Sequence, residues 1–143
     1  MTTVIPIVAL TSAAFMSGVL WLVQIVHYPL LGEVSDAAIR EISSRHQKLI
    51  TRVVGPIMVI EAVSSLFVLV LHPNQGLYLV FAAMALLVVA ILVTMLQAIP
   101  LHSQIAKGNS HLIPRLIRIN WARTTAWSLR IPLGILIVHK AFP

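Results

Sequence analysis

The side chains best suited to chemistry in this sequence lie between residues 120 and 130, inside the last long apolar segment. Asn120, Arg123, Trp127 and Arg130 follow one another at steps of three or four residues. At about 100° per residue, they fall with Gly134 within one arc of about 80° on a helix. A charged side chain inside a bilayer is costly and usually faces a partner or a water-filled cavity. The spacing therefore predicts a buried polar stripe along one face of a helix.

Glu61 is the only acidic residue in the middle of any other apolar segment. At a rise of about 1.5 Å per residue, it lies about 13 Å beyond Arg52, and Arg130 lies about 18 Å beyond Arg118. Glu61 and Arg130 are therefore expected at similar depth, where they could pair. The pair could be purely structural, or the carboxylate could serve proton transfer or anion binding. Because ionisable groups inside a membrane are usually functional, we take Glu61, Arg123 and Arg130 as the catalytic candidates.

The remaining polar side chains of the stripe and its neighbours suggest a ligand. Two arginines against one glutamate leave an excess of positive charge, which favours an anionic or carbonyl-bearing molecule. Gln24, Gln97 and Asn120 are expected to donate orienting hydrogen bonds to it. Trp127 could stack on a flat ligand or on Arg123, although tryptophan is also common at membrane interfaces.

Histidines near the same end offer a second kind of chemistry. His27 and His102, with His46, could form a metal or haem site or a proton relay, since imidazole suits iron, copper and zinc. No His-x-x-His or Glu-x-x-His motif of the kind found in di-iron bundles is present in the sequence. The ordinary alternative is that these histidines hydrogen-bond to loops. The cofactor is therefore left open between a metal, a haem, a quinone and none.

The elements that must position these residues are membrane helices. Hydrophobic residues make up 59% of the 143 and charged residues only 10%, against about 25% in soluble domains. Apolar runs cover about residues 4–26, 53–71, 77–97 and 117–139, and a bilayer core needs about 20 residues of helix. The sequence thus predicts one all-α membrane domain over residues 1–143, a bundle of four transmembrane helices. Trp21 and Tyr28 are expected to anchor the first helix at the interface.

Residues 30–51 interleave charged with apolar side chains, and they predict an amphipathic interfacial helix between the first two spans. Only Lys140 is expected at the opposite end of the bundle. The connections 28–52 and 98–118 hold seven basic residues: Arg40, Arg45, Lys48, Arg52, Lys107, Arg115 and Arg118. Positive loops stay in the cytoplasm, so both termini are expected on the non-cytoplasmic side. The start of the chain lacks the basic region of a cleavable signal peptide, so the first helix should be retained. The net charge of +6 is not read as a nucleic-acid signal, because the basic residues lack interleaved aromatic residues on a surface.

Two sets of residues resemble known families. The stretch from Gln24 to Pro29 with His46, followed by Val54-Gly55-Pro56, Met58 and Glu61, resembles uncharacterised bacterial four-helix membrane proteins. The stretch from Gln97 to His102, with Asn120-Trp121-x-Arg123-Thr124, is similar to the anthrone-oxygenase-like membrane family, which usually has asparagine where His102 stands here. The resemblance implies a four-helix protein of the bacterial inner membrane. It also implies oxidation of a polycyclic or quinone-like compound without a well-defined cofactor.

These observations support a buried polar pocket on the cytoplasmic side that binds a small redox-active or quinone-like molecule, as in an oxygenase or oxidoreductase. Whether a reaction is catalysed stays open. The alternative is a non-catalytic accessory subunit of a larger respiratory or photosynthetic membrane complex, with other membrane subunits as partners and a histidine-ligated pigment or haem. A small transporter is disfavoured, because transporters often contain repeats and none is evident in the sequence.

Overall fold

The computed structural model describes residues 4–71 and 76–141, and this part of the chain is helical apart from short connections. In chain order the elements are α1 (Val4–Leu22), the π-helix η1 (Val23–His27), α2 (Tyr28–Gly32), α3 (Ile39–Leu71), α4 (Leu77–Val93), the π-helix η2 (Thr94–Ala98), α5 (Ile99–Ile105), the 3-10 turn η3 (Ser110–Leu112) and α6 (Ile113–Ala141). No strand occurs within the described residues, so the predicted all-α class is confirmed.

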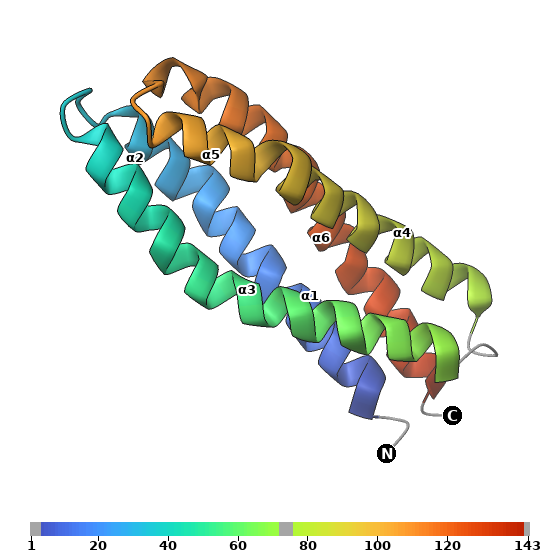
Figure 1. Ribbon diagram of the computed structural model, residues 1–143. Helices are drawn as coiled ribbons and strands as arrows, with labels where there is room; N and C mark the ends of the chain where they lie inside the picture. The colour runs from blue at the N-terminus through green and yellow to red at the C-terminus, as the bar shows by residue number, and fades with distance from the viewer. Residues whose placement is uncertain (1–3, 72–75, 142–143) are drawn as a thin grey trace.

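The elements form four rods that run side by side (Figure 1). The first rod is α1, η1 and α2, the second is α3, the third is α4, η2 and α5, and the fourth is α6. The start of α1 and the end of α6 lie at one end of the bundle, and both long connections lie at the other. There the hydroxyl of Ser110 donates a 2.7 Å hydrogen bond to Asp36 and ties the two connections together.

The rods are not packed evenly around the bundle. The principal contacts join α1 to α6, α6 to α4, and α1 to α3, whereas α3 touches α4 and α5 much less. The bundle therefore has one open side, between the second and third rods.

Three of the rods are long and apolar enough to cross a membrane: Val4–Gly32, Ile39–Leu71 and Leu77–Ile105. Large apolar side chains face outward on them, among them Val59, Val70 and Leu96, which are 63–69% exposed. α6 has 29 residues but also contains four arginines, which lower its hydropathy. Three of the four expected spans are thus helices of sufficient length and apolarity.

The expected amphipathic helix between the first two spans is not a separate element. Residues from Ile39 onward belong to α3, which continues for 33 residues. No turn residue separates Ile39 from Val53, so the polar segment and the apolar segment share one helix. At about 1.5 Å per residue α3 is about 50 Å long, which exceeds the bilayer core of about 30 Å.

The interior of the bundle is layered. Apolar clusters form around Ile137, around Trp127 with Ala126, and around Leu116 with Ile113, and these positions succeed one another along α6. Arg130 lies between the first two clusters in the sequence, and Arg123 lies between the last two. The polar stripe of α6 is therefore divided into two polar layers.

Candidate functional site

The buried face of α6 carries the predicted stripe. Asn120, Arg123, Trp127 and Arg130 are all less than 10% exposed, and each faces the other rods. The prediction of a buried polar stripe is confirmed. The stripe, however, serves two separate sites.

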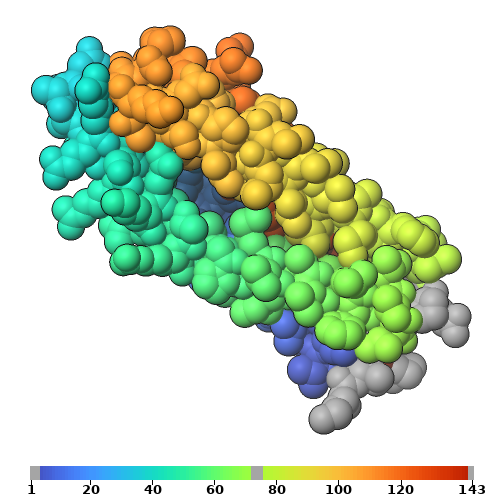
Figure 2. Space-filling view, in the orientation of Figure 1, coloured from blue at the N-terminus to red at the C-terminus, as the bar shows by residue number. Residues whose placement is uncertain are grey.

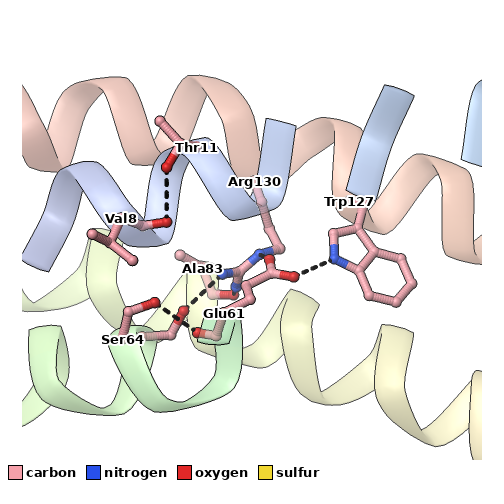
Figure 3. A network of polar contacts seen from close by, with 8 residues as sticks. Val8, Thr11, Glu61, Ser64, Ala83, Trp127 and Arg130 are labelled. Atoms are coloured by element: carbon pink, nitrogen blue, oxygen red, sulfur yellow. Dashed lines mark hydrogen bonds and ion pairs between the residues drawn. The ribbon is translucent and has the colours of Figure 1, made fainter. Parts of the chain in front are cut away.

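The layer of Arg130 is an internal ion pair (Figure 3). Arg130 Nε donates to Glu61 Oε1 at 2.8 Å, and Trp127 Nε1 donates to Glu61 Oε2 at 2.8 Å. The other guanidinium nitrogens donate to the carbonyl oxygen of Ala83 and, at 2.9 Å, to the hydroxyl of Ser65. The expected pairing of Glu61 with Arg130 is confirmed, and each guanidinium nitrogen and each carboxylate oxygen has a hydrogen-bond partner in the protein.

Little space adjoins this ion pair. The cavity that Arg130 lines has a volume of about 30 Å³, far below the range of about 300–1,000 Å³ typical of small-molecule sites. Glu61 is fully buried and is not among the residues that line this cavity. These contacts favour the structural reading of the pair.

In the layer of Arg123, the guanidinium donates hydrogen bonds to neutral side chains. Arg123 Nε donates to Thr94 Oγ1 at 2.9 Å, and its Nη1 donates to Asn120 Oδ1 at 3.0 Å. Asn120 Nδ2 donates in turn to Gln24 Oε1 at 2.8 Å. The Arg123 guanidinium also lies 5.9 Å from the centre of the Trp127 ring. Asn120 and Gln24 thus orient Arg123.

Arg123 is 7% exposed and has no carboxylate beside it. Among the described residues the only ion pair is the one between Arg130 and Glu61. A buried charge is costly unless it is paired and hydrogen-bonded. Arg123 is therefore the one site in this layer where an anionic or carbonyl oxygen would find an uncompensated cation.

A cavity of about 360 Å³ opens beside Arg123, at the open side of the bundle. This volume is within the range of about 300–1,000 Å³ typical of small-molecule sites. Figure 2 shows the hollow between the green atoms of α3 and the orange and yellow atoms of α5 and η2, with the first rod in blue behind it. The lining is mostly apolar, and the polar side chains in it are Tyr28, His46, Gln47, Thr51, Thr94, His102 and Arg123.

Aromatic and histidine side chains form a cluster at this cavity. The Tyr28 hydroxyl and His102 Nε2 are 2.8 Å apart, and Gln47 Nε2 donates to the His102 carbonyl oxygen at 2.8 Å. The His27 and His46 rings stack with their centres 3.9 Å apart, and His46 lies 5.6 Å from His102. His102 Nδ1 and His27 Nε2 are buried and have no hydrogen-bond partner among the described residues.

The structure therefore joins His27 and His102 to one cluster, as a relay would require. In the part of the chain that the structure describes, no group of three or more His, Cys, Asp or Glu side chains is placed to hold a metal ion. The His27 and His46 planes differ by only 21°, so their in-plane lone pairs run side by side instead of converging. Metal binding at His27 and His102 stays a prediction without such a ligand set.

Gln97 does not reach the cavity, in contrast to the expectation. It is exposed and lines an outer groove with Arg115 and Arg118. Thr94 and Ala98 are buried, as are Ala90, Leu101 and Ile105 at steps of three or four residues along the same rod. Gln97 lies at the edge of this buried face and points out.

Tyr28 was expected at the interface, but it is 2% exposed and bonded to His102. This role of Tyr28 was not predicted from the sequence. A signal that could have indicated it is proline, because Pro29 and Pro100 each follow a π-helical segment by two residues. π-helical turns inside α-helices frequently occur at functional sites.

Comparison of the chain with protein-family models, with curated proteins and with solved structures finds no match. The resemblance to the anthrone-oxygenase-like family therefore stays a prediction that rests on the residue patterns alone.

Proposed function

We propose that this chain is an integral membrane protein of the bacterial inner membrane, with all four rods across the bilayer and both termini on the non-cytoplasmic side. Three rods are long and apolar enough to cross the bilayer. In α6, Arg123 and Arg130 face the interior of the bundle, so their charges do not oppose insertion of this helix. The basic connections gather at one end of the bundle, as the positive-inside rule requires.

The cavity beside Arg123 binds a small, flat, hydrophobic molecule that carries a carbonyl or anionic oxygen, as a quinone does. The observation that carries this proposal is a buried arginine without a carboxylate partner at the wall of a largely apolar cavity of about 360 Å³. The apolar walls, with Leu20, Val54 and Met58, suit a ring system. The resemblance to the anthrone-oxygenase-like family implies the same class of compound.

Each polar group has a role in this proposal. Arg123 donates hydrogen bonds to the ligand oxygen, and it stabilises negative charge on that oxygen. Thr94 and Asn120 hold the guanidinium in place. Tyr28 and His102 both line the cavity, and the Tyr28 hydroxyl with His102 Nε2, 2.8 Å apart, is the pair that exchanges a proton at the cavity wall.

Glu61 and Arg130 have a structural role in this proposal instead of a catalytic one. Their charges cancel within the protein, and Trp127 and Ser65 complete their hydrogen bonds. The pair fixes α6 against α3, and it thereby sets the position of Arg123, about two turns away on α6.

Binding of a naphthoquinone tests the proposal, with naphthalene as the matched probe that lacks oxygen. The naphthoquinone should raise the melting temperature of the detergent-solubilised protein, since a ligand that binds only the folded state stabilises it. Naphthalene should raise it much less. Equal effects of the two probes would show partitioning into apolar space and would contradict the role of Arg123.

A variant that fills the cavity locates the binding. Gly55 lines the cavity, and a Cβ atom there would meet only Thr51 Cγ2, at 3.9 Å, so Gly55→Phe should place its ring in the open space. The matched control is Gly18→Phe, because a Cβ atom at Gly18 meets nothing within 4 Å and that glycine lies on the exposed face of α1. The naphthoquinone effect should disappear in Gly55→Phe and persist in Gly18→Phe. Its persistence in both variants would place the ligand elsewhere.

A further inference from the structure

A second hollow lies on the outer side of the bundle, between the third rod and α6. It has a volume of about 450 Å³ and is lined by Val93, Gln97, Arg115, Arg118, Ile119 and Ala122. Four of these residues lie on one face of α6, because they are spaced three or four residues apart along the helix: Arg115, Arg118, Ile119 and Ala122. None of the six lines the cavity beside Arg123, and the groove is therefore a separate site.

The lining of this groove changes from polar to apolar along the bundle. Arg115 is in the first turn of α6, at the end where the long connections lie, and Ala122 is about 10 Å further along the helix. On the facing rod, which runs in the opposite direction, Gln97 is one turn nearer the same end than Val93. The groove thus has two arginines and an amide at its outer end, and Val93, Ile119 and Ala122 further in.

The charge of the groove is uncompensated. Arg115 and Arg118 are exposed, and no carboxylate is among the lining residues. Neither arginine takes part in an ion pair within residues 4–71 and 76–141. The guanidinium group matches the geometry of a phosphate and binds it in a bidentate manner.

We propose that this groove binds one anionic phospholipid, with its phosphate between Arg115 and Arg118 and the start of its acyl chains along Val93, Ile119 and Ala122. The order of polar and apolar lining repeats the order of headgroup and hydrocarbon in a leaflet, whose headgroup region is about 5–8 Å deep. Basic pockets between membrane helices bind anionic headgroups in this way. The inference rests on insertion of the chain into a bilayer, but not on the ligand of the cavity.

Native mass spectrometry of the purified full chain tests this site, after exchange into micelles that contain equal amounts of phosphatidylglycerol and phosphatidylcholine. The wild type should retain one phosphatidylglycerol in preference to phosphatidylcholine. Because each arginine near a membrane surface contributes about 1 kcal/mol, the double variant R115Q/R118Q should reduce this preference about 30-fold. Circular dichroism checks that the variant remains helical.

The matched control is R45Q/R52Q, which removes two exposed arginines of α3 outside the groove and changes the net charge equally. This variant should keep the preference. An equal loss in both double variants would show a general effect of charge, and an unchanged preference in R115Q/R118Q would place the lipid elsewhere; either result overturns the proposal. So would displacement of the lipid by millimolar inorganic phosphate, because the site would then bind a free anion.

Discussion

Arg123 and Arg130 are two turns apart on one face of α6, but their guanidinium groups have different hydrogen-bond partners and different counter-charges. Arg130 has a carboxylate, a hydroxyl and a carbonyl oxygen as acceptors, and the cavity that it lines has a volume of only about 30 Å³. Arg123 donates to the neutral oxygens of Thr94 and Asn120, takes part in no ion pair within the described residues, and adjoins a cavity of about 360 Å³. The same side chain is therefore part of the packing at one position and is available to a ligand at the other.

At Glu61 the account predicts a large loss of stability on Glu61→Gln. The substitution leaves Arg130 buried without its counter-charge, and breaking a buried pair from one side costs about 3–5 kcal/mol. Thermal melting in detergent measures the change. The exposed Glu41 provides the control, and Glu41→Gln should alter the free energy of unfolding by less than about 0.5 kcal/mol. Equal melting temperatures of Glu61→Gln and Glu41→Gln would show that the ion pair does not stabilise the fold.

Much of this residue-scale picture could be predicted from the sequence, because charges inside apolar segments are rare and have few partners. The stripe of Asn120, Arg123, Trp127 and Arg130 and its pairing with Glu61 follow from helical period and depth. The separation of the stripe into two layers could not be predicted. It depends on which neighbouring side chains leave space, and periodicity within one helix holds no information about that.

At the scale of elements, the first and third rods have the same construction. Each is an α-helix, a π-helical turn of five residues and a short α-helix that begins one residue before a proline. Proline cannot donate to the preceding turn, and the wider π turn accommodates this. The two π turns contain Gln24 and Thr94, which face α6 from either side of Arg123's layer. Gln97 follows Thr94 by three residues and lies at the edge of the buried face, so helical spacing alone could not decide whether it points inward.

The close packing of α1 on α6 gives a prediction at Gly134. A Cβ atom there would lie 2.9 Å from Leu10 Cδ1 and 3.7 Å from Leu10 Cα, so a large side chain must push the helices apart. Gly134→Leu should destabilise the protein by about 1–3 kcal/mol, which thermal melting measures. Gly18→Leu, on the exposed face of α1, should be nearly neutral. A neutral Gly134→Leu would mean that the two helices are not in close contact.

At the scale of the whole molecule, the bundle is open on one side, between α3 and the third rod, and the candidate ligand site is reached from there. In a bilayer this side faces lipid, so an apolar ligand could enter from the membrane. The number of rods and their helical nature could be predicted, since apolar runs of this length have few alternatives. The position of the open side could not be predicted, because the outward faces of all rods are similarly apolar.

The proposed topology predicts which residues a membrane-impermeant thiol reagent reaches. The chain has no cysteine, so single cysteines report without interference. In spheroplasts Lys140→Cys, at the exposed end of α6, should react at once, and Asn109→Cys, in the connection between α5 and α6, should react only after the membrane is disrupted. The reverse pattern would invert the orientation. Reaction of both before disruption would argue against insertion.

The measurement that tests the central claim most directly is the affinity of a naphthoquinone for Arg123→Lys. Lysine keeps the charge but lacks the planar fork that can bind the ligand oxygen while it holds Thr94 and Asn120. We predict that the variant folds and melts close to the wild type, while its affinity falls about 10- to 100-fold, the worth of one charged hydrogen bond. An affinity equal to that of the wild type would contradict the account, because Arg123 would then be a structural residue.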